Sequence, residues 1–237
     1  MALAATTAEA QVDGDTAAEV ALAVAEAALV VVAVASAAAA RRGDGETVAM
    51  NIKRIVKHLF ATEGQVKRAF PHGALKAIEK AISASESEHH GEIRFAIEGA
   101  LDGEPLFKGQ SSRERAVDVF SQLRVWDTRH NAGLLIYLLL ADRTVEIVAD
   151  RGIHDRVGTK KWEKICKSME TAFKQSNFEG GVIAGVQAVT QHLKAHFPVH
   201  GADRNELPDK PAILSRTVQQ YREAHDQRPA NPDSHFN

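Results

Sequence analysis

The chain has 237 residues and a formal net charge of −2 at pH 7. That length allows one domain of ordinary size with tails, or two small domains, and a charge so close to zero gives no reason to expect nucleic-acid binding. The only cysteine, Cys166, excludes an intramolecular disulfide, which fits a reducing compartment such as the cytoplasm. It lies on an apolar helical stripe, so we expect it to be a core residue and not a nucleophile.

Residues 1–49 form a low-complexity segment dominated by alanine and valine. Residues 27–40 carry no charge, yet a bilayer span needs about 20 strongly apolar residues and alanine contributes weakly. The residues before this run are acidic, unlike those of a secretory signal. Three interpretations stay open: an extension ahead of a natural start at Met50, a helix that touches a membrane, and a packed helix. The first predicts a cytoplasmic protein and the second predicts membrane association.

Residues 50–87 are predicted to form helices. Apolar residues recur at helical spacing over Ile52–Phe60 and are surrounded by lysine and arginine, which indicates a short basic amphipathic helix. That helix either docks on a membrane surface or a protein partner, or lies on the domain with its basic face in solvent. Pro71 ends this region, and a second helix is predicted from about Gly73 to Ser85.

Residues 88–197 alternate between strand and helix patterns. The first strand, Glu92–Leu101, has alternating apolar residues, so we expect one face under helices and the other more polar or partly covered. Ser111 and Glu114 have the spacing of a capping box at the start of the next helix. Gly133–Leu140 is wholly apolar, which is typical of a central strand, and Thr144–Ala149 returns antiparallel after a tight turn.

These elements predict an α/β fold, a three-layer α/β/α sandwich. Its small mixed sheet contains a β-α-β unit followed by a β-hairpin, and two helices with apolar stripes, Trp162–Phe173 and Val182–Leu193, complete the domain. Residues 198–237 hold five of the seven prolines and few large apolar side chains. We expect that tail to be mostly disordered.

Strand direction places three polar segments at one edge of the sheet, which we call the rim. The first two strands are parallel and the third is antiparallel, so the starts of the first two share an edge with the end of the third. The segments are His89–Glu92, Trp126–Asn131 and Asp150–Asp155. The last of these is expected to be a loop.

Carboxylate and amide oxygens at the rim suit a hard divalent cation, Ca²⁺ or Mg²⁺, and histidine ligands would admit zinc or manganese. A cation there could activate water and polarise a phosphate. The alternative is that these residues only cap turns or form exposed ion pairs. The candidate metal ligands are Asp127, Asn131, Asp150, His130 and Asp155, the candidate catalytic carboxylates are Asp127 and Asp150, and the candidate phosphate-binding residues are Arg129 and Arg151.

The sequence around the predicted hairpin resembles the TPM-domain family, whose members include a thylakoid-lumen acid-phosphatase-like protein and a photosystem II repair protein. The resemblance lies in F-S-Q-L-R-V-W-D-T-R-H-N-A-G-L-L-I-Y-L-L-L-A-D-R-T-V-E-I-V-A-D-R-G-I and in the later E-G-G-V-I-A-G-V, and covers roughly Glu88 to Phe197. The tail motif N-E-L-P-D-K-P resembles bacterial members. The usual glycine-rich loop is shortened here to Asp150–Ile153. The residues on the matching pattern are Trp126, Asp127, Asn131, Asp150 and Gly152.

The resemblance implies an α/β/α sandwich, divalent-cation binding in some members, and acid-phosphatase activity in the plant one. Other members resemble assembly or regulatory factors. Two classes of function therefore stay open: a metal-assisted phosphomonoesterase, and a non-catalytic membrane-associated assembly or regulatory module that binds its partner through Ile52–Phe60.

Overall fold

The computed structural model describes residues 45–61, 63–101, 103–199 and 205–214. The chain divides into two compact units, Met1–Val56 and Lys57–Asn237. Helix α2 spans Gly45–Leu59, so it already begins ahead of Met50; the remainder of the predicted extension, residues 1–44, lies outside the described residues. No helix in the described ranges is long and apolar enough to cross a membrane.

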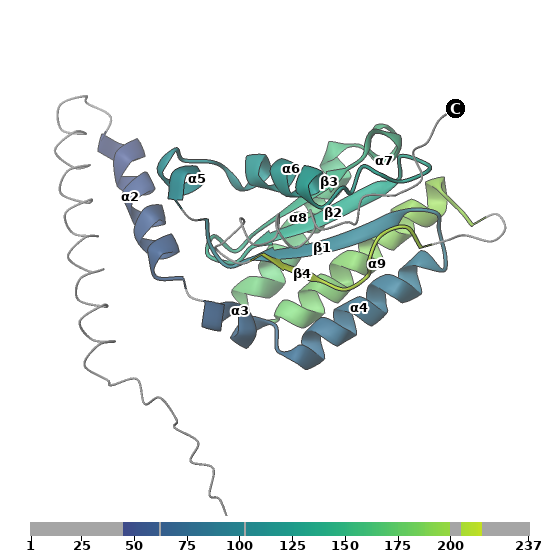
Figure 1. The fold of residues 1–237 in the computed structure, drawn as a ribbon, viewed down its shortest axis with the longest axis horizontal. Helices are drawn as coiled ribbons and strands as arrows, with labels where there is room; N and C mark the ends of the chain where they lie inside the picture. Colours follow the sequence, from purple (N-terminus) through teal and green to yellow (C-terminus); the bar gives the residue numbers. More distant parts are fainter. Residues whose placement is uncertain (1–44, 62, 102, 200–204, 215–237) are drawn as a thin grey trace, which may run out of the picture. The chain divides into compact units, whose positions relative to one another are not determined.

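The second unit has the alternation of helices and strands that the sequence predicts. Figure 1 shows its helices on both sides of a central sheet. Its elements are α3 (Glu63–Ala69), α4 (His72–Glu86), β1 (Glu92–Glu98), α5 (Gly103–Phe107), α6 (Ser112–Gln122), β2 (Gly133–Leu139), β3 (Thr144–Ala149), α7 (Arg151–Val157), α8 (Thr159–Lys174), α9 (Phe178–His196) and β4 (Ala212–Leu214).

The sheet has the order β3-β2-β1-β4. Strand β1 is parallel to β2, and β2 is antiparallel to β3, as the sequence predicts. Strand β4 adds to the free edge of β1 in parallel orientation, with Ala96 opposite Ala212. The sequence analysis places β4 in a disordered tail, so the structure adds one strand to the predicted sheet.

The two faces of the sheet are covered by different helices, which makes the three-layer α/β/α sandwich. One face carries Ile93, Phe95 and Ile97 of β1 and packs with the apolar stripes of α4, α8 and α9 into the main core. Helix α6 covers the other face and contacts β2 and β3. Its start has the predicted capping box, because the side chain of Ser111 accepts from the backbone of Glu114 while the Glu114 carboxylate accepts from Ser111.

The second face of β1 is polar, which is one of the two predicted alternatives, but it is fully covered, because all seven residues of the strand are buried. Arg94 donates to the backbone carbonyls of Pro208 and Lys210 in the tail, and Glu98 pairs with Arg115 of α6. Polar side chains on this face are thus paired in the interior and not exposed to solvent.

A segment predicted to be a loop is a short helix. The loop expected from Asp150 to Asp155 is wrong, because α7 begins at Arg151 with Asp150 as its N-cap. Another short helix, α5, follows β1, and Pro105 falls in its first turn, where it breaks no helical hydrogen bond. Cys166 packs against the core as predicted, and burial raises the pKa of its thiol to about 12, which keeps it protonated.

Candidate functional site at the rim of the sheet

The three predicted segments meet at the rim. The backbone N–H of Glu92, at the start of β1, donates to the carbonyl of Ala132 at 2.9 Å, and the N–H of Asp150 donates to the carbonyl of Gly133 at 2.8 Å. These two bonds tie the first and third segments to the two residues that directly follow the second segment. The juxtaposition inferred from strand direction is therefore present.

The backbone of Gly152 lies close against the turn at His130 and Asn131. A Cβ atom built on Gly152 would lie 2.7 Å from the backbone oxygen of Asn131, so only glycine allows this contact without a shift of the backbone. Asn131 itself has a φ of 49°, a left-handed conformation that asparagine tolerates better than most residues. The start of α7 is therefore held against the loop that precedes β2.

Asp150 is the most buried of the three candidate carboxylate ligands, Asp127, Asp150 and Asp155. Its Oδ1 accepts from the backbone N–H of Arg151 at 2.6 Å and so caps α7. Its Oδ2 is buried, and no side chain or backbone group among the described residues donates to it. A buried carboxylate oxygen without a donor costs at least about 1–3 kcal/mol, so the binding of a cation, a donor group or a water molecule to this atom would stabilise the protein.

The remaining predicted residues are more exposed. Asp127, Arg129, Arg151 and Asp155 all face solvent, and Asp155 lies on α7 beyond its first turn. The rings of His130 and His90 lie side by side, with centroids 5.6 Å apart. Within the described ranges no three His, Cys, Asp or Glu side chains are grouped so as to hold a metal ion.

His89 does not face the rim, although its position in the sequence places it there. It is buried, and its Nε2 lies 2.9 Å from the hydroxyl of Ser85 on α4. That hydroxyl accepts from Thr190 of α9 at 2.8 Å. His89 thus belongs to a polar network inside the helical layer, and its backbone forms a bridge with Pro198.

The rim also contains a segment that the sequence analysis leaves in the tail, residues 205–211, which we call the strap. The carboxylate of Glu206 accepts from the backbone N–H of Arg129 at 2.7 Å, and the carboxylate of Glu92 accepts from the N–H of Leu207 at 3.1 Å. The strap therefore joins the first two rim segments and brings its own carboxylates to them. The only sequence signal was the polar motif N-E-L-P-D-K-P, which says nothing about where it docks.

A cluster of carboxyl groups missed by the sequence analysis lies under the strap. Glu86, at the end of α4, accepts from the backbone N–H of Ile93 at 2.8 Å and hydrogen-bonds to Asp209. Burial, with further repulsion from Glu92 and Asp209, raises the pKa of Glu86 to about 9. Glu86 therefore carries a proton at neutral pH and shares it with Asp209.

Replacing Glu86 with glutamine is expected to change how stability depends on pH. The neutral carboxyl group stabilises the fold fully below its ordinary pKa of 4.5, and this contribution is lost as pH rises towards 9. Between pH 5 and pH 8 the free energy of unfolding of the Glu86→Gln variant should rise by about 2 kcal/mol relative to that of the parent. A fully buried group would give about 1.4 kcal/mol for each pH unit, and the effect is smaller here because the side chain keeps some solvent access. Urea unfolding at several pH values measures this gain.

The control for Glu86 is Glu88→Gln, two residues further on. Glu88 is exposed and its pKa is lowered by its hydrogen bond to Lys194, so it is ionised throughout this pH window. Its variant should show no comparable slope. A Glu86→Gln variant whose stability tracks that of the parent at every pH would mean that Glu86 is ionised in the folded protein.

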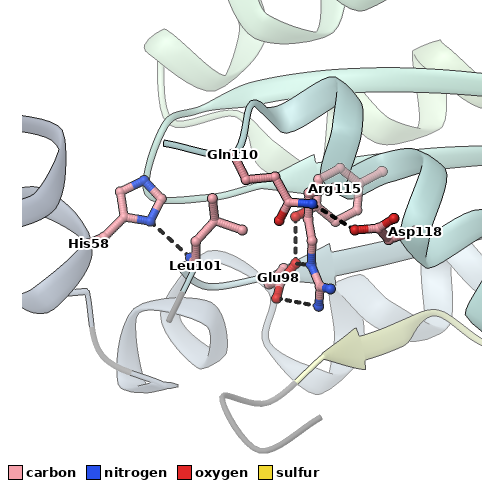
Figure 2. A network of polar contacts seen from close by, with 7 residues as sticks. His58, Glu98, Leu101, Gln110, Arg115 and Asp118 are labelled. Carbon is pink, nitrogen blue, oxygen red and sulfur yellow. Dashed lines mark hydrogen bonds and ion pairs between the residues drawn. The ribbon is translucent and has the colours of Figure 1, made fainter. Parts of the chain in front are cut away.

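A second polar network lies at the opposite end of β1, and Figure 2 shows it at close range. Arg115 makes two hydrogen bonds of 2.8 and 2.9 Å to the carboxylate of Glu98, which also accepts from the hydroxyl of Tyr137. Nearby, Nδ1 of His58 accepts from the backbone N–H of Leu101 at 2.9 Å. All three members of the Glu98 network are buried, so we read it as a structural ion pair.

Comparison with known proteins agrees with the fold. The family model described as the TPM domain matches residues 68–192, more than half of the chain. The NMR structure of the BA42 protein from the psychrophilic bacterium Bizionia argentinensis superposes with a TM-score of 0.53 at 32% identity, covering 60% of this chain and 93% of that one. The N-terminal domain of a protein from P. gingivalis gives a TM-score of 0.44 at 21% identity, covering 55% and 82%. No curated protein gave a significant match. The chain belongs to the TPM-domain family.

Proposed function

We propose that the protein binds a divalent cation, Ca²⁺ or Mg²⁺, at the rim of the sheet with Asp150 as its anchoring ligand. The observation that carries this proposal is the buried Oδ2 of Asp150, which no described group satisfies. A bound cation would meet that need directly. Asp150 directly precedes α7, and the start of that helix contacts the loop before β2 through Gly152.

The donors near Asp150 fit a hard cation better than a zinc-type site. Asn131 offers an amide oxygen, and the backbone oxygens of His130 and Asn131 lie against Gly152. Oxygen donors of this kind, completed by water, are what Ca²⁺ and Mg²⁺ take. A structural zinc site is usually built from four histidine or cysteine ligands. Among the rim histidines, His90 and His130 are a pair in ring contact, whereas His89 faces Ser85 in the helical layer.

Calorimetric titration of the full chain with Ca²⁺, Mg²⁺, Mn²⁺ and Zn²⁺ tests the proposal. We expect one saturable site for Ca²⁺ or Mg²⁺, and binding at least about tenfold weaker in Asp150→Asn, which is a loss of about 1.4 kcal/mol. Asparagine is a good N-cap, so this substitution removes the charge but keeps the cap of α7. Unchanged affinity in Asp150→Asn would reject Asp150 as the anchor.

The control for this titration is Glu163→Gln, which makes the same change of charge on an exposed position of α8. It should leave the affinity unchanged. Asp127→Asn and Asp155→Asn then map the remaining candidate ligands. Because both side chains are exposed, we expect smaller losses than for Asp150.

A second candidate function at the same place is hydrolysis of phosphomonoesters. It is favoured by Arg129 and Arg151, which flank the contact between Asn131 and Gly152 and face solvent. In this reaction a water oxygen bonds to phosphorus while the ester P–O bond breaks, and the alcohol leaves with a proton. The arginines would bind phosphate oxygens, Asp127 would accept the proton from water, and a bound cation would supply charge neutralisation.

Turnover of p-nitrophenyl phosphate tests this second candidate. It should depend on added cation and fall strongly in Asp127→Ala, while the cation affinity falls less. Turnover that is equal in the parent and in both Asp127→Ala and Asp150→Asn would end the phosphatase proposal without touching the cation site.

The alternative function is that of a non-catalytic module that docks on a membrane through Ile52–Phe60. It is supported by the exposed side chains at the end of that segment. Phe60 is 53% exposed, and the Lys57 side chain beside it is 52% exposed. Sedimentation with vesicles of phosphatidylcholine and phosphatidylserine should then carry down the parent but not Phe60→Ser with Lys57→Glu. Equal sedimentation of both proteins would remove the alternative.

A further inference from the structure

Helices α8 and α9 enclose a groove that none of the rim residues lines. It has a volume of about 450 Å³ and its floor is mainly apolar, formed in part by Met169, Ala184 and Ala188. This volume lies within the range of sites for small ligands, about 300–1,000 Å³. The groove is therefore large enough to hold a small apolar group.

Small residues on α9 create the hollow. A Cβ atom built on Gly185 would lie 2.3 Å from the sulfur of Met169, so glycine lets α8 pack directly on the backbone of α9. Ala184 and Ala188 are four residues apart and so lie on one face of α9, where both line the groove. Neither has a side chain long enough to fill the space between the helices.

The lip of the groove is cationic. Lys161 and Lys164 of α8 both line it, together with His192 of α9, and no Asp or Glu is among its lining residues. Residues three apart on a helix are neighbours, so the two lysines can contact one and the same anionic group. Burial, with repulsion from Lys161 and His196, lowers the pKa of His192, so at neutral pH the charge of the lip comes from the lysines.

We propose that the α8–α9 groove binds a single-chain anionic amphiphile, such as a carboxylate with a medium-length alkyl tail. The apolar floor suits the tail, and the two lysines suit one head group by charge complementarity. An acidic amphipathic helix from a partner protein would need a longer cationic stripe than one pair of lysines. The site is separate from the rim and does not depend on the proposed cation.

Three probes with the same alkyl tail and different head groups test the proposal on the full chain: dodecanoate, dodecanol and dodecyltrimethylammonium. The two ionic probes are used below their micelle concentrations, and dodecanol is used below its solubility limit. Trp162 packs edge-on against His192, with ring centroids 5.8 Å apart, so its fluorescence reports on the groove once the exposed Trp126 is replaced by phenylalanine. Dodecanoate should bind saturably and at least about tenfold more tightly than the other two.

Two pairs of matched variants locate the site. Lys161→Glu combined with Lys164→Glu should weaken the binding of dodecanoate at least about tenfold. Lys160→Glu combined with Lys167→Glu makes the same charge change at exposed positions of α8 that do not line the groove, and it should leave the binding unchanged. Ala184→Trp should block the groove, and Ala195→Trp, also on α9 and exposed, should not. Thermal melts show that each variant is folded.

Several outcomes would overturn the proposal. Equal binding of all three probes would mean unspecific partition into an apolar surface. Dodecanoate binding that survives both Lys161→Glu with Lys164→Glu and Ala184→Trp would place the site elsewhere, and so would loss of binding in Asp150→Asn. Binding of an acidic amphipathic peptide without binding of dodecanoate would assign the groove to a protein partner.

Discussion

Replacing Arg115 with methionine is expected to lower the free energy of unfolding by about 3–5 kcal/mol. The substitution leaves the carboxylate of Glu98, which is only 5% exposed, without its cation in the interior. Tyr137 carries no positive charge that could replace that of Arg115. Burial, and to a smaller extent the charge of Glu98, raises the pKa of the Tyr137 hydroxyl, so it stays protonated and donates a hydrogen bond. Chemical unfolding followed by circular dichroism measures the loss.

A double variant separates the lost interaction from the charge left behind. Glu98→Gln combined with Arg115→Met removes both charges, so it should be more stable than Arg115→Met alone. The exposed ion pair of Lys194 with Glu88 is the matched control, and Lys194→Met should cost far less because water screens that pair. If Arg115→Met and Lys194→Met had equal effects, the Glu98 network would not be a buried ion pair.

Replacing Gly133 with alanine is the second substitution with a large expected effect, about 3 kcal/mol or more, or failure to fold. Its Cβ would lie 1.8 Å from the backbone oxygen of Val125, a contact that a side-chain rotation cannot relieve. Gly133 begins β2 and is paired with Glu92 of β1. A shift there would move the loop from Trp126 to Asn131, and with it the rim.

The matched control is Gly73→Ala in the first turn of α4. No atom lies within 4 Å of a Cβ built there, so alanine should stabilise the helix by about 0.5–1 kcal/mol. The two variants add the same methyl group and are expected to have opposite signs. Equal thermal stability of Gly133→Ala and the parent would contradict the packing of β2 against Val125.

The core of the fold was accessible from the sequence because its signals are local and periodic. The apolar run of β2, the tight turn and the alternation of β3 predict a hairpin, and strand direction then predicts the rim. The capping box at Ser111 and Glu114 is confirmed atom by atom. In each case the residues that decide the structure are close together in the sequence.

The features that the sequence analysis missed depend on distant partners. Arg94 and Glu98 are typical of a solvated strand face until the strap and Arg115 supply their partners. His89 lies just before β1, where a rim residue would lie, yet its side chain points into the helical layer and hydrogen-bonds to Ser85. The hydrogen bonds that join the strap to Arg129 and Glu92 each have a backbone N–H as the donor, and a backbone group carries no residue signature.

The position of the rim was predictable from the sequence, but the environment of its individual carboxyl groups was not. Asp150 was expected in a loop as an open ligand, whereas the structure uses one of its oxygens as the N-cap of α7 and leaves the other buried. Glu86 lies one residue past the predicted end of its helix at Ser85, and nothing in the sequence marks it as a part-buried acid with a raised pKa. Burial, which periodicity cannot reveal here, decides the chemistry of both carboxyl groups.

Amide chemical-shift mapping detects cation binding at the rim residue by residue. During titration of the ¹⁵N-labelled full chain with Ca²⁺ and then Mg²⁺, saturable shifts are expected for the amides of Asn131, Arg151 and Gly152. Amides of the α8–α9 groove, such as those of Lys164 and Ala188, should stay in place. Saturable shifts confined to another part of the chain, or no shifts at the rim at millimolar cation, would mean that the cation does not bind at the rim.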